Sequence, residues 1–225
     1  MKVSEIFKSI EGEGLRTGQA AVFVRLYGCN LRCAYCDSMY AVEGDDFKTM
    51  SVDEVVGAVE LYRKECGVKC VTLTGGEPLL HQGVDELLAK LSDLGFFVNI
   101  ETNGTVPCKW RHPGLFYTMD WKCKSSGMSS KMKIENMETL GSQDVLKFVV
   151  GSAEDLEETE SVVVRLSQRK PSRGMPHIFV SPVFGAISAE NIVECMLKNR
   201  IMTENNARFQ VQLHKIVWNP DMRGV

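Results

Sequence analysis

The stretch Tyr27-Gly28-Cys29-Asn30-Leu31-Arg32-Cys33-Ala34-Tyr35-Cys36-Asp37 places three cysteines within a single short segment, at the spacing Cys-x3-Cys-x2-Cys. A structural zinc site takes four ligands, and no fourth cysteine or histidine lies close by in the sequence. Three thiolates with one open metal position are typical of an iron–sulfur cluster whose remaining iron binds an external ligand. Two alternatives stay open at this point: zinc completed by the distant Cys66 or Cys70, and three unligated thiols.

Around this loop the chain alternates segments typical of strands and of helices. The predicted strands are 21–27, 70–74, 96–101, 115–120, 145–150, 177–181 and 209–213; the predicted helices are 51–65, 84–94, 154–169 and 188–200. Repeated βα units predict a parallel sheet with right-handed crossovers. Because six or seven strands are fewer than a closed barrel of eight requires, we expect an α/β fold: an open partial (β/α) barrel of mostly parallel strands, in a single domain spanning 1–225.

Composition excludes several classes of protein. The chain has 225 residues with 44% hydrophobic and 24% charged side chains, and its net charge is only −3. These values argue against a disordered chain, and they give no reason to expect a nucleic-acid partner. No export signal and no 18-residue apolar run is found. We therefore expect a soluble cytoplasmic protein with no membrane partner and with reduced thiols.

Unusual residues follow several predicted strands, at the strand ends where ligands bind in such folds. Glycines there let the backbone approach a ligand closely, although an ordinary βα turn is the alternative. The segments concerned are Gly75-Gly76-Glu77, Thr102-Asn103-Gly104, Trp121-Lys122, Pro182 and His214.

The cysteine loop, with Tyr35 directly before its last cysteine, resembles the signature of the radical S-adenosylmethionine (SAM) superfamily. The resemblance implies a 4Fe-4S cluster on Cys29, Cys33 and Cys36, whose open iron binds SAM for cleavage to a 5′-deoxyadenosyl radical. Gly75-Gly76-Glu77 is similar to the superfamily motif that holds the methionine ammonium. The residues that the resemblance assigns to SAM are Tyr35, Asp37, Gly75, Gly76, Glu77, Asn103, Asp120, Trp121, Lys122 and Ser181; many relatives carry Ser-Pro-Lys at 120–122.

Segments at both ends of the chain resemble the 7-carboxy-7-deazaguanine synthase family of deazapurine (queuosine precursor) biosynthesis. They are Glu5 to Gly14, Gly18, Phe23 to Leu26, Cys36 to Ser38, Gln212 to Lys215 and Arg223 to Val225. The resemblance implies a radical SAM carbon–nitrogen lyase that contracts the ring of 6-carboxy-5,6,7,8-tetrahydropterin to 7-carboxy-7-deazaguanine with loss of ammonia. It further implies Mg²⁺, a homodimer and an electron donor such as flavodoxin or ferredoxin.

The resemblance also implies a substrate site. The backbone of Ile10-Glu11-Gly12 and the carboxylates of Glu11 and Glu13 suit the guanidine-like edge of a pterin, and Arg25 suits its carboxylate. Thr74, His214 and Val225 occupy further family positions at the substrate. Ser38 stands where the family has a threonine ligand for Mg²⁺, and a hydroxyl oxygen suits this hard ion.

Two rival functions remain at this stage. An activase that takes hydrogen from a glycine of a partner protein would share the cysteine and Gly-Gly-Glu motifs, but it would not require the segment 10–14, Arg25 or Ser38. A zinc-stabilised binding module would need no iron or sulfide. The other cysteines are predicted to be free thiols outside the cluster: Cys66, Cys70, Cys108, Cys123 and Cys195.

Overall fold

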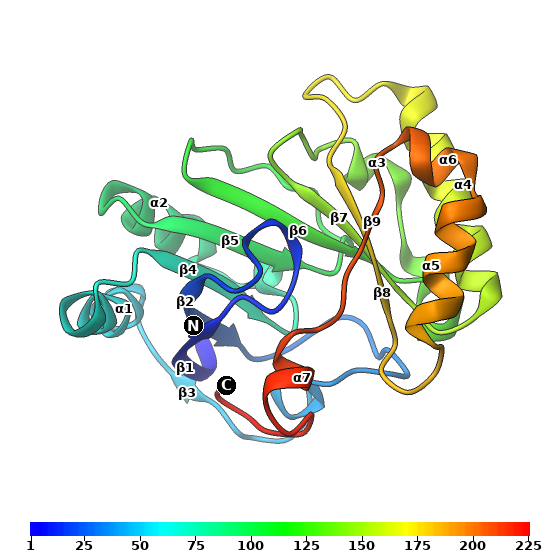
Figure 1. The fold of residues 1–225 in the computed structure, drawn as a ribbon. Coiled ribbons are helices and arrows are strands. Elements are labelled where there is room, and N and C mark those ends of the chain that lie inside the picture. Colours follow the sequence, from blue (N-terminus) through cyan, green and yellow to red (C-terminus); the bar gives the residue numbers. More distant parts are fainter.

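A computed structural model describes all 225 residues and shows one open sheet of nine strands (Figure 1). The strands are β1 (Lys2–Ile10), β2 (Ala20–Leu26), β3 (Lys48–Thr49), β4 (Cys70–Gly75), β5 (Phe97–Thr102), β6 (Leu115–Trp121), β7 (Val145–Val150), β8 (His177–Pro182) and β9 (Arg208–Phe209). Their order across the sheet is β3-β1-β2-β4-β5-β6-β7-β8-β9. All neighbours from β2 to β9 are parallel, whereas β1 is antiparallel to both β2 and β3. The predicted open, mostly parallel α/β architecture is confirmed.

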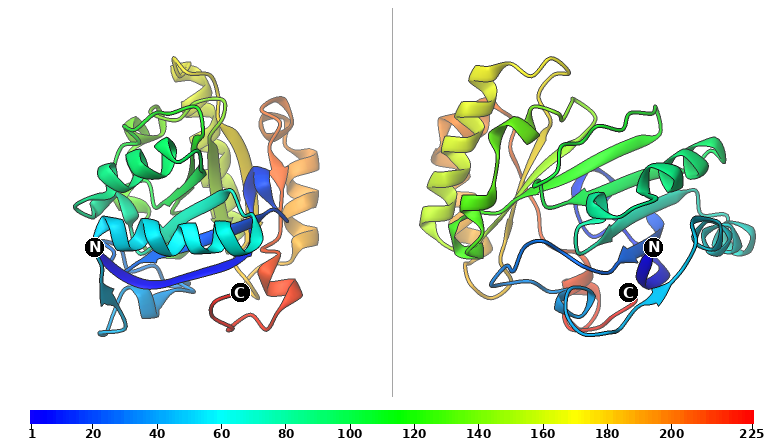
Figure 2. Two further views of the ribbon diagram at one scale, coloured as in Figure 1. Left: turned by 90° about the vertical axis from the view of Figure 1, so that its left-hand side faces the viewer. Right: turned by 180° about the vertical axis from the view of Figure 1, so that it is seen from behind.

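The principal helices lie around the outside of the curved sheet (Figure 2). The helices are α1 (Val52–Cys66), α2 (Val84–Asp93), α3 (Ile134–Met137), α4 (Ala153–Arg169), α5 (Ala189–Lys198), α6 (Arg200–Glu204) and α7 (His214–Val217). Ser51 and Glu54 form the predicted capping box of α1, and Ser152 caps α4. None of these helices combines the length and the apolar character needed to cross a membrane.

Alternation along the strands separates the hydrophobic core from a polar interior face. In β2, Val22, Val24 and Leu26 belong to the core cluster beneath the helices, while Phe23 and Arg25 line a cavity on the other face. The same division holds in the strands that follow, because successive side chains of a strand point to opposite faces. The concave face of the sheet therefore carries polar residues of β4 to β7, among them Thr74, Glu101, Thr118, Asp120 and Lys147.

The structure contains two strands that were not predicted, and two of the predicted elements are wrong in extent. The antiparallel strands β1 and β3 were not predicted, and the predicted strand 209–213 is reduced to Arg208–Phe209. The predicted helix 188–200 is two helices, because the Asn199 side chain accepts a hydrogen bond from the Met202 N–H and so begins α6. His214 accordingly does not follow a strand but opens the short helix α7.

Candidate active site

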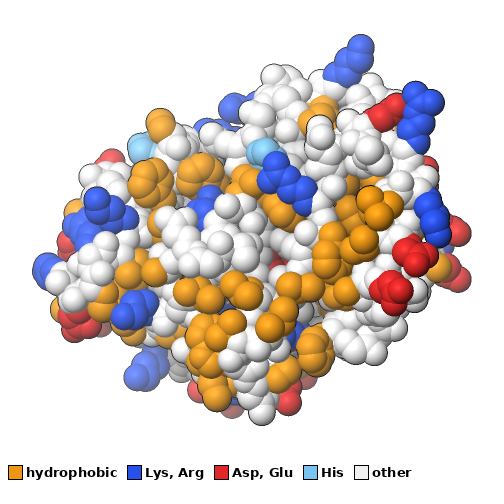
Figure 3. Space-filling model, viewed as in Figure 1, with side chains coloured by type: hydrophobic (Ala, Val, Ile, Leu, Met, Phe, Trp, Pro, Cys, Tyr) orange, Lys and Arg blue, Asp and Glu red, His pale blue; other side chains and the backbone are white.

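A cavity of about 700 Å³ lies on the concave face, at the carboxyl ends of the parallel strands. Its lining brings together the residues before β2, the cysteine loop, the strand ends and the C-terminal residues 220–225. Ile216 and Val217 of α7, Met222 of the C-terminal segment and Phe184 after β8 are exposed apolar side chains. Figure 3 shows hydrophobic side chains gathered on this side of the molecule. The volume is within the range of small-molecule sites.

Three cysteine thiols face this cavity together. Cys29, Cys33 and Cys36 are free and partly buried, and all three line the cavity; none of the other five cysteines does. The Leu31 N–H and the Asn103 side-chain amide donate to the Cys29 sulfur, at 3.4 and 3.5 Å. Burial raises the pKa of the Cys33 thiol to about 11, against the attraction of the Lys122 ammonium. Three thiols in one loop, of which Cys29 accepts N–H hydrogen bonds at its sulfur, fit an iron–sulfur cluster that leaves one iron open.

Two glycines allow the turn after β4 to pack directly against the start of the cysteine loop. A Cβ atom on Gly75 would lie 2.0 Å from the Leu26 carbonyl oxygen, and one on Gly76 would lie 1.9 Å from the Gly28 carbonyl oxygen. The Glu77 N–H donates to that Gly28 carbonyl at 2.9 Å. Both glycines also line the cavity. Sequence reasoning assigned them to a close approach to a ligand; a close approach between two backbone segments also requires them.

The Glu77 carboxylate is completely buried and does not line the cavity. It accepts hydrogen bonds from the Asn103 N–H at 2.6 Å, the Thr102 hydroxyl at 2.9 Å and the Leu79 N–H at 3.0 Å. Glu77 thereby ties the turn after β4 to the turn after β5. The Asn103 amide, held by this contact, lies in the cavity beside Cys29 and Asn30.

Arg25 presents a free guanidinium fork to the cavity. Its Nε donates to the Glu5 carboxylate at 2.7 Å, and the Tyr40 hydroxyl donates to the same Glu5 oxygen at 2.6 Å. The two terminal nitrogens of Arg25 make no hydrogen bond within the chain, although the side chain is only 17% exposed. Thr74, its partner in the β2–β4 register, also faces the cavity. Two parallel N–H donors in one plane match a carboxylate.

The two acidic residues before β2 have different surroundings. The Glu13 carboxylate lines the cavity, whereas that of Glu11 is buried against the Thr72 hydroxyl and does not. Burial, reinforced by the charge of Glu101, raises the pKa of Glu11 to about 7. Glu101 also lines the cavity, and its carboxylate accepts a hydrogen bond from the Thr74 hydroxyl at 2.7 Å. Its position in β5, one residue before the predicted turn at 102–104, could have indicated it.

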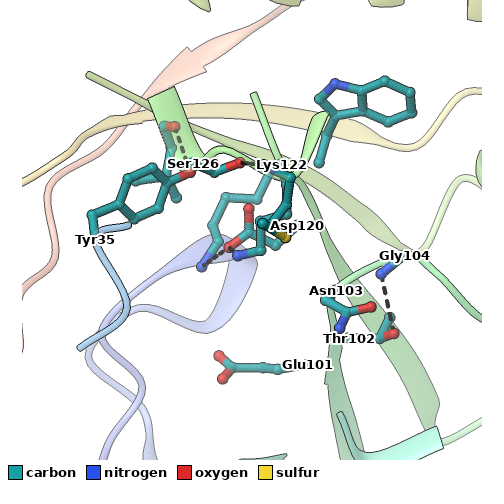
Figure 4. A network of polar contacts seen from close by, with 12 residues as sticks. Tyr35, Glu101, Thr102, Asn103, Gly104, Asp120, Lys122 and Ser126 are labelled. Atoms are coloured by element: carbon teal, nitrogen blue, oxygen red, sulfur yellow. Dashed lines mark hydrogen bonds and ion pairs between the residues drawn. The ribbon is translucent and has the colours of Figure 1, made fainter. Parts of the chain in front are cut away.

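Asp120 and Lys122 form an ion pair at 2.8 Å across the cavity from Glu101, as Figure 4 shows. Lys147 approaches the same Asp120 oxygen at 3.6 Å, and the other Asp120 oxygen is buried without a partner. Burial alone would lower the pKa of Lys122, but the adjacent Asp120 keeps it above its ordinary value. Sequence reasoning missed Lys147, a lysine in the middle of an apolar strand.

Other predicted residues also meet at this cavity. The Ser38 hydroxyl faces it and donates to the Asp37 carboxylate at 2.7 Å. His214 lies against Gly12, where a Cβ atom would be 2.8 Å from the imidazole Nδ1, and burial lowers the pKa of this histidine. The remaining predicted residues that line the cavity are Ile10, Tyr35 and Val225.

Two further predicted residues point elsewhere. The Trp121 side chain alternates away from Asp120, joins the core cluster and donates to Glu158 at 3.1 Å. Ser181 is fully buried in β8, where its hydroxyl donates to the Glu13 carboxylate at 3.4 Å. Neither residue lines the cavity, so the structure brings together most but not all of the predicted site.

Comparison with known proteins matches residues 23–112 to the radical SAM superfamily. The chain is 45% identical to the 7-carboxy-7-deazaguanine synthase of Clostridium acetobutylicum, an alignment that covers 100% of this chain and 99% of that protein. It is 39% identical to the synthase of the same name from Methanospirillum hungatei, with 98% and 86% covered.

Solved structures resemble the fold. The crystal structure of QueE from Escherichia coli superposes with a TM-score of 0.74 at 24% identity and covers 95% of this chain and 94% of that one. Streptococcus suis SuiB bound to S-adenosylmethionine superposes with a TM-score of 0.56 at 13% identity, covering 84% of this chain and 51% of SuiB. At these identities the likeness establishes the fold alone.

Proposed function

Because this chain belongs to the 7-carboxy-7-deazaguanine synthase family of radical SAM enzymes, we propose that its cavity converts 6-carboxy-5,6,7,8-tetrahydropterin to 7-carboxy-7-deazaguanine with loss of ammonia. One observation carries the proposal: a single cavity contains both the three thiols of the cysteine loop and the free fork of Arg25. The first group suits radical chemistry, and the second suits the carboxylate that distinguishes this substrate from other pterins.

Cys29, Cys33 and Cys36 would hold the cluster. When bound, the cluster and SAM together supply the 5′-deoxyadenosyl radical that removes hydrogen from C6 of the substrate. The chain contributes the shape and the polar groups around them. For SAM we propose the backbone at Gly75-Gly76 and the side chains of Asn103, Asp120 and Lys122, all of which line the cavity beside the thiols.

Substrate recognition is assigned to the opposite part of the same cavity. Arg25 would bind the pterin carboxylate through its two free nitrogens, while Glu5 and Tyr40 fix the plane of the guanidinium. The guanidine-like edge of the pterin needs acceptors, which the carboxylates of Glu13 and Glu101 and the backbone at Ile10 and Gly12 offer. The Glu11 carboxylate is buried and does not line the cavity, so it would not contact the pterin directly.

Ser38 is the proposed Mg²⁺ ligand. Its hydroxyl oxygen lies 2.7 Å from an Asp37 carboxylate oxygen at the cavity wall. Two adjacent hard oxygen donors suit Mg²⁺, which completes its coordination with water and ligand oxygens. We further expect, from the family resemblance, a homodimer reduced by a carrier such as flavodoxin or ferredoxin, and we place it in the cytoplasm because the sequence shows no export signal.

The test is an anaerobic assay of the reconstituted enzyme with the carboxypterin, SAM, a reductant and Mg²⁺, followed by mass spectrometry. The proposed function predicts 7-carboxy-7-deazaguanine together with ammonia, and no product from the Cys36→Ala variant. SAM cleavage that leaves the pterin unchanged, combined with hydrogen abstraction from a protein glycine, would instead identify an activase.

A further inference from the structure

Lys147 is a buried cation that the assignments above do not use. It lies in the middle of β7, whose six residues are all buried. Its neighbours Leu146 and Phe148 belong to the hydrophobic core, so alternation directs Lys147 to the cavity, where its side chain is 9% exposed. A lysine is almost never buried to this extent unless it is paired.

Two carboxylates from different parts of the chain provide that pairing. Lys147 Nζ lies 2.8 Å from a Glu13 oxygen and 3.6 Å from an Asp120 oxygen. Asp120 is its direct partner in the parallel β6–β7 register, so the sheet itself brings this pair together. Glu13 comes from the loop that follows β1. Burial would lower the pKa of Lys147, yet these acids hold it well above its ordinary value, so the ammonium stays charged.

Glu13 depends on this lysine for its orientation. The contact with Lys147 is the one short hydrogen bond to its carboxylate, because the donors to its other oxygen, Gln210 and Ser181, lie at 3.3 and 3.4 Å. Hydrogen bonds of that length are weak. Without the ammonium, the Glu13 carboxylate would be free to turn within the cavity.

Asp120 needs a donor that the chain does not supply. One of its oxygens is shared between Lys122 at 2.8 Å and Lys147 at 3.6 Å. The other oxygen is buried and has no hydrogen-bond partner. A buried acceptor without a partner is costly, so this oxygen is suited to a donor group on a bound ligand. Lys122 makes the short contact to Asp120, and Lys147 adds only a longer ion pair, so the orientation of Asp120 does not depend on Lys147.

We propose that Lys147 is a positioning residue, whose ammonium holds the Glu13 carboxylate in the orientation in which it accepts hydrogen bonds from the bound pterin. The inference rests on the proposed function, since that function supplies the ligands. Lys147 acts through Glu13, so its removal weakens the binding of pterin. The proposed SAM acceptor Asp120 keeps its 2.8 Å contact with Lys122, so SAM binding is retained.

The experiment measures equilibrium binding of 6-carboxy-5,6,7,8-tetrahydropterin and of SAM, each by anaerobic calorimetry on the cluster-loaded enzyme without reductant. Lys147→Met should raise the pterin Kd about thirtyfold or more, as expected when one partner of a buried charged pair is removed, and it should leave the SAM Kd close to the wild-type value. Lys147→Arg retains the charge and should recover most of the pterin affinity. In the Glu13→Gln background, Lys147→Met should add little further loss of pterin affinity, because its effect there passes through Glu13.

A control distinguishes positioning from general destabilisation. Arg111→Met removes the cation of another largely buried ion pair, Arg111–Asp144, which lies outside the cavity. It should lower the melting temperature and leave both Kd values unchanged. If Lys147→Met does not fold, the Glu13→Gln/Lys147→Met double variant, in which both charges are removed, is compared with Glu13→Gln alone.

Unchanged pterin affinity in folded Lys147→Met would overturn the inference. Losses that multiply when Lys147→Met and Glu13→Gln are combined would also overturn it, because Lys147 would then act independently of Glu13. Failure of the wild-type enzyme to bind or convert the carboxypterin would be a different result. That outcome would contradict the proposed function itself.

Discussion

Arg25 illustrates how one side chain acquires a specific role from its neighbours. Its Nε is engaged by Glu5, so the remaining two nitrogens present a planar fork to the cavity. Arg25→Lys keeps a positive charge but loses that plane. We expect it to weaken carboxypterin binding about tenfold or more, on the scale of a charge-assisted hydrogen bond, while iron content stays at the wild-type level. Equal Kd values for wild type and Arg25→Lys in calorimetry would remove Arg25 from the substrate site.

Ser38 is the residue on which the magnesium proposal depends. Ser38→Ala removes one of two adjacent oxygens at the cavity wall, so product formation should lose most of its stimulation by Mg²⁺. Ser38→Thr retains the hydroxyl and should remain stimulated. Product formation against Mg²⁺ concentration for the three proteins tests this, and three superimposable curves would show that Ser38 is only a turn residue.

Glu11 makes stability depend on pH. Its pKa rises from the ordinary glutamate value of 4.5 to about 7 in the folded protein, chiefly through burial. Between these values the folded state binds more protons than the unfolded state, so the free energy of unfolding falls as pH rises. Glu11→Gln keeps an acceptor for Thr72 but cannot ionise. From pH 5 to pH 8 wild type should therefore lose about 2 kcal/mol relative to Glu11→Gln in urea unfolding; a pH-independent difference would refute the assignment.

At the scale of elements, the contact between the turn after β4 and the cysteine loop fixes the geometry of the thiols. In Gly76→Ala the new Cβ atom would lie 1.9 Å from the Gly28 carbonyl oxygen, so the two segments must separate. We expect a stability loss of about 1–3 kcal/mol, typical of overpacking, and a reduced iron content after reconstitution. Gly57→Ala in α1, where a Cβ atom meets nothing within 4 Å, is the matched control and should bind iron normally. Normal iron content in Gly76→Ala would contradict this account.

The parallel strands and their helices were predictable because period-two and period-3.6 patterns, with capping signals such as that of Ser51, are local properties of the sequence. The strand β1 was not, because polar residues occur on both of its faces and its sequence was interpreted only as a motif. The rule that ligands bind at strand ends indicated the cysteine loop, Asn103 and Lys122 as site residues, and the three thiols, Asn103 and Lys122 all line the cavity. It could not identify Lys147, which lies within a strand, nor show that the Glu77 and Trp121 side chains turn away from the cavity.

At the scale of the whole molecule, one curved sheet separates two environments. The face covered by helices is apolar, and the concave face carries the charged and polar side chains of β2 to β7 together with the cysteine loop. Residues 220–225 also line the concave cavity, so both ends of the chain contribute to it. The thiols and the Arg25 fork therefore line one cavity, so radical chemistry and substrate recognition share a single site.

The amount of product formed from the carboxypterin when SAM is limiting tests most directly whether both processes occur in this one cavity. If the hydrogen taken from C6 is returned after ring contraction in the same cavity, SAM acts catalytically. Mass spectrometry should then find more 7-carboxy-7-deazaguanine than SAM supplied, with one ammonia released for each product molecule. SAM consumed to 5′-deoxyadenosine while the carboxypterin is recovered unchanged would contradict the account.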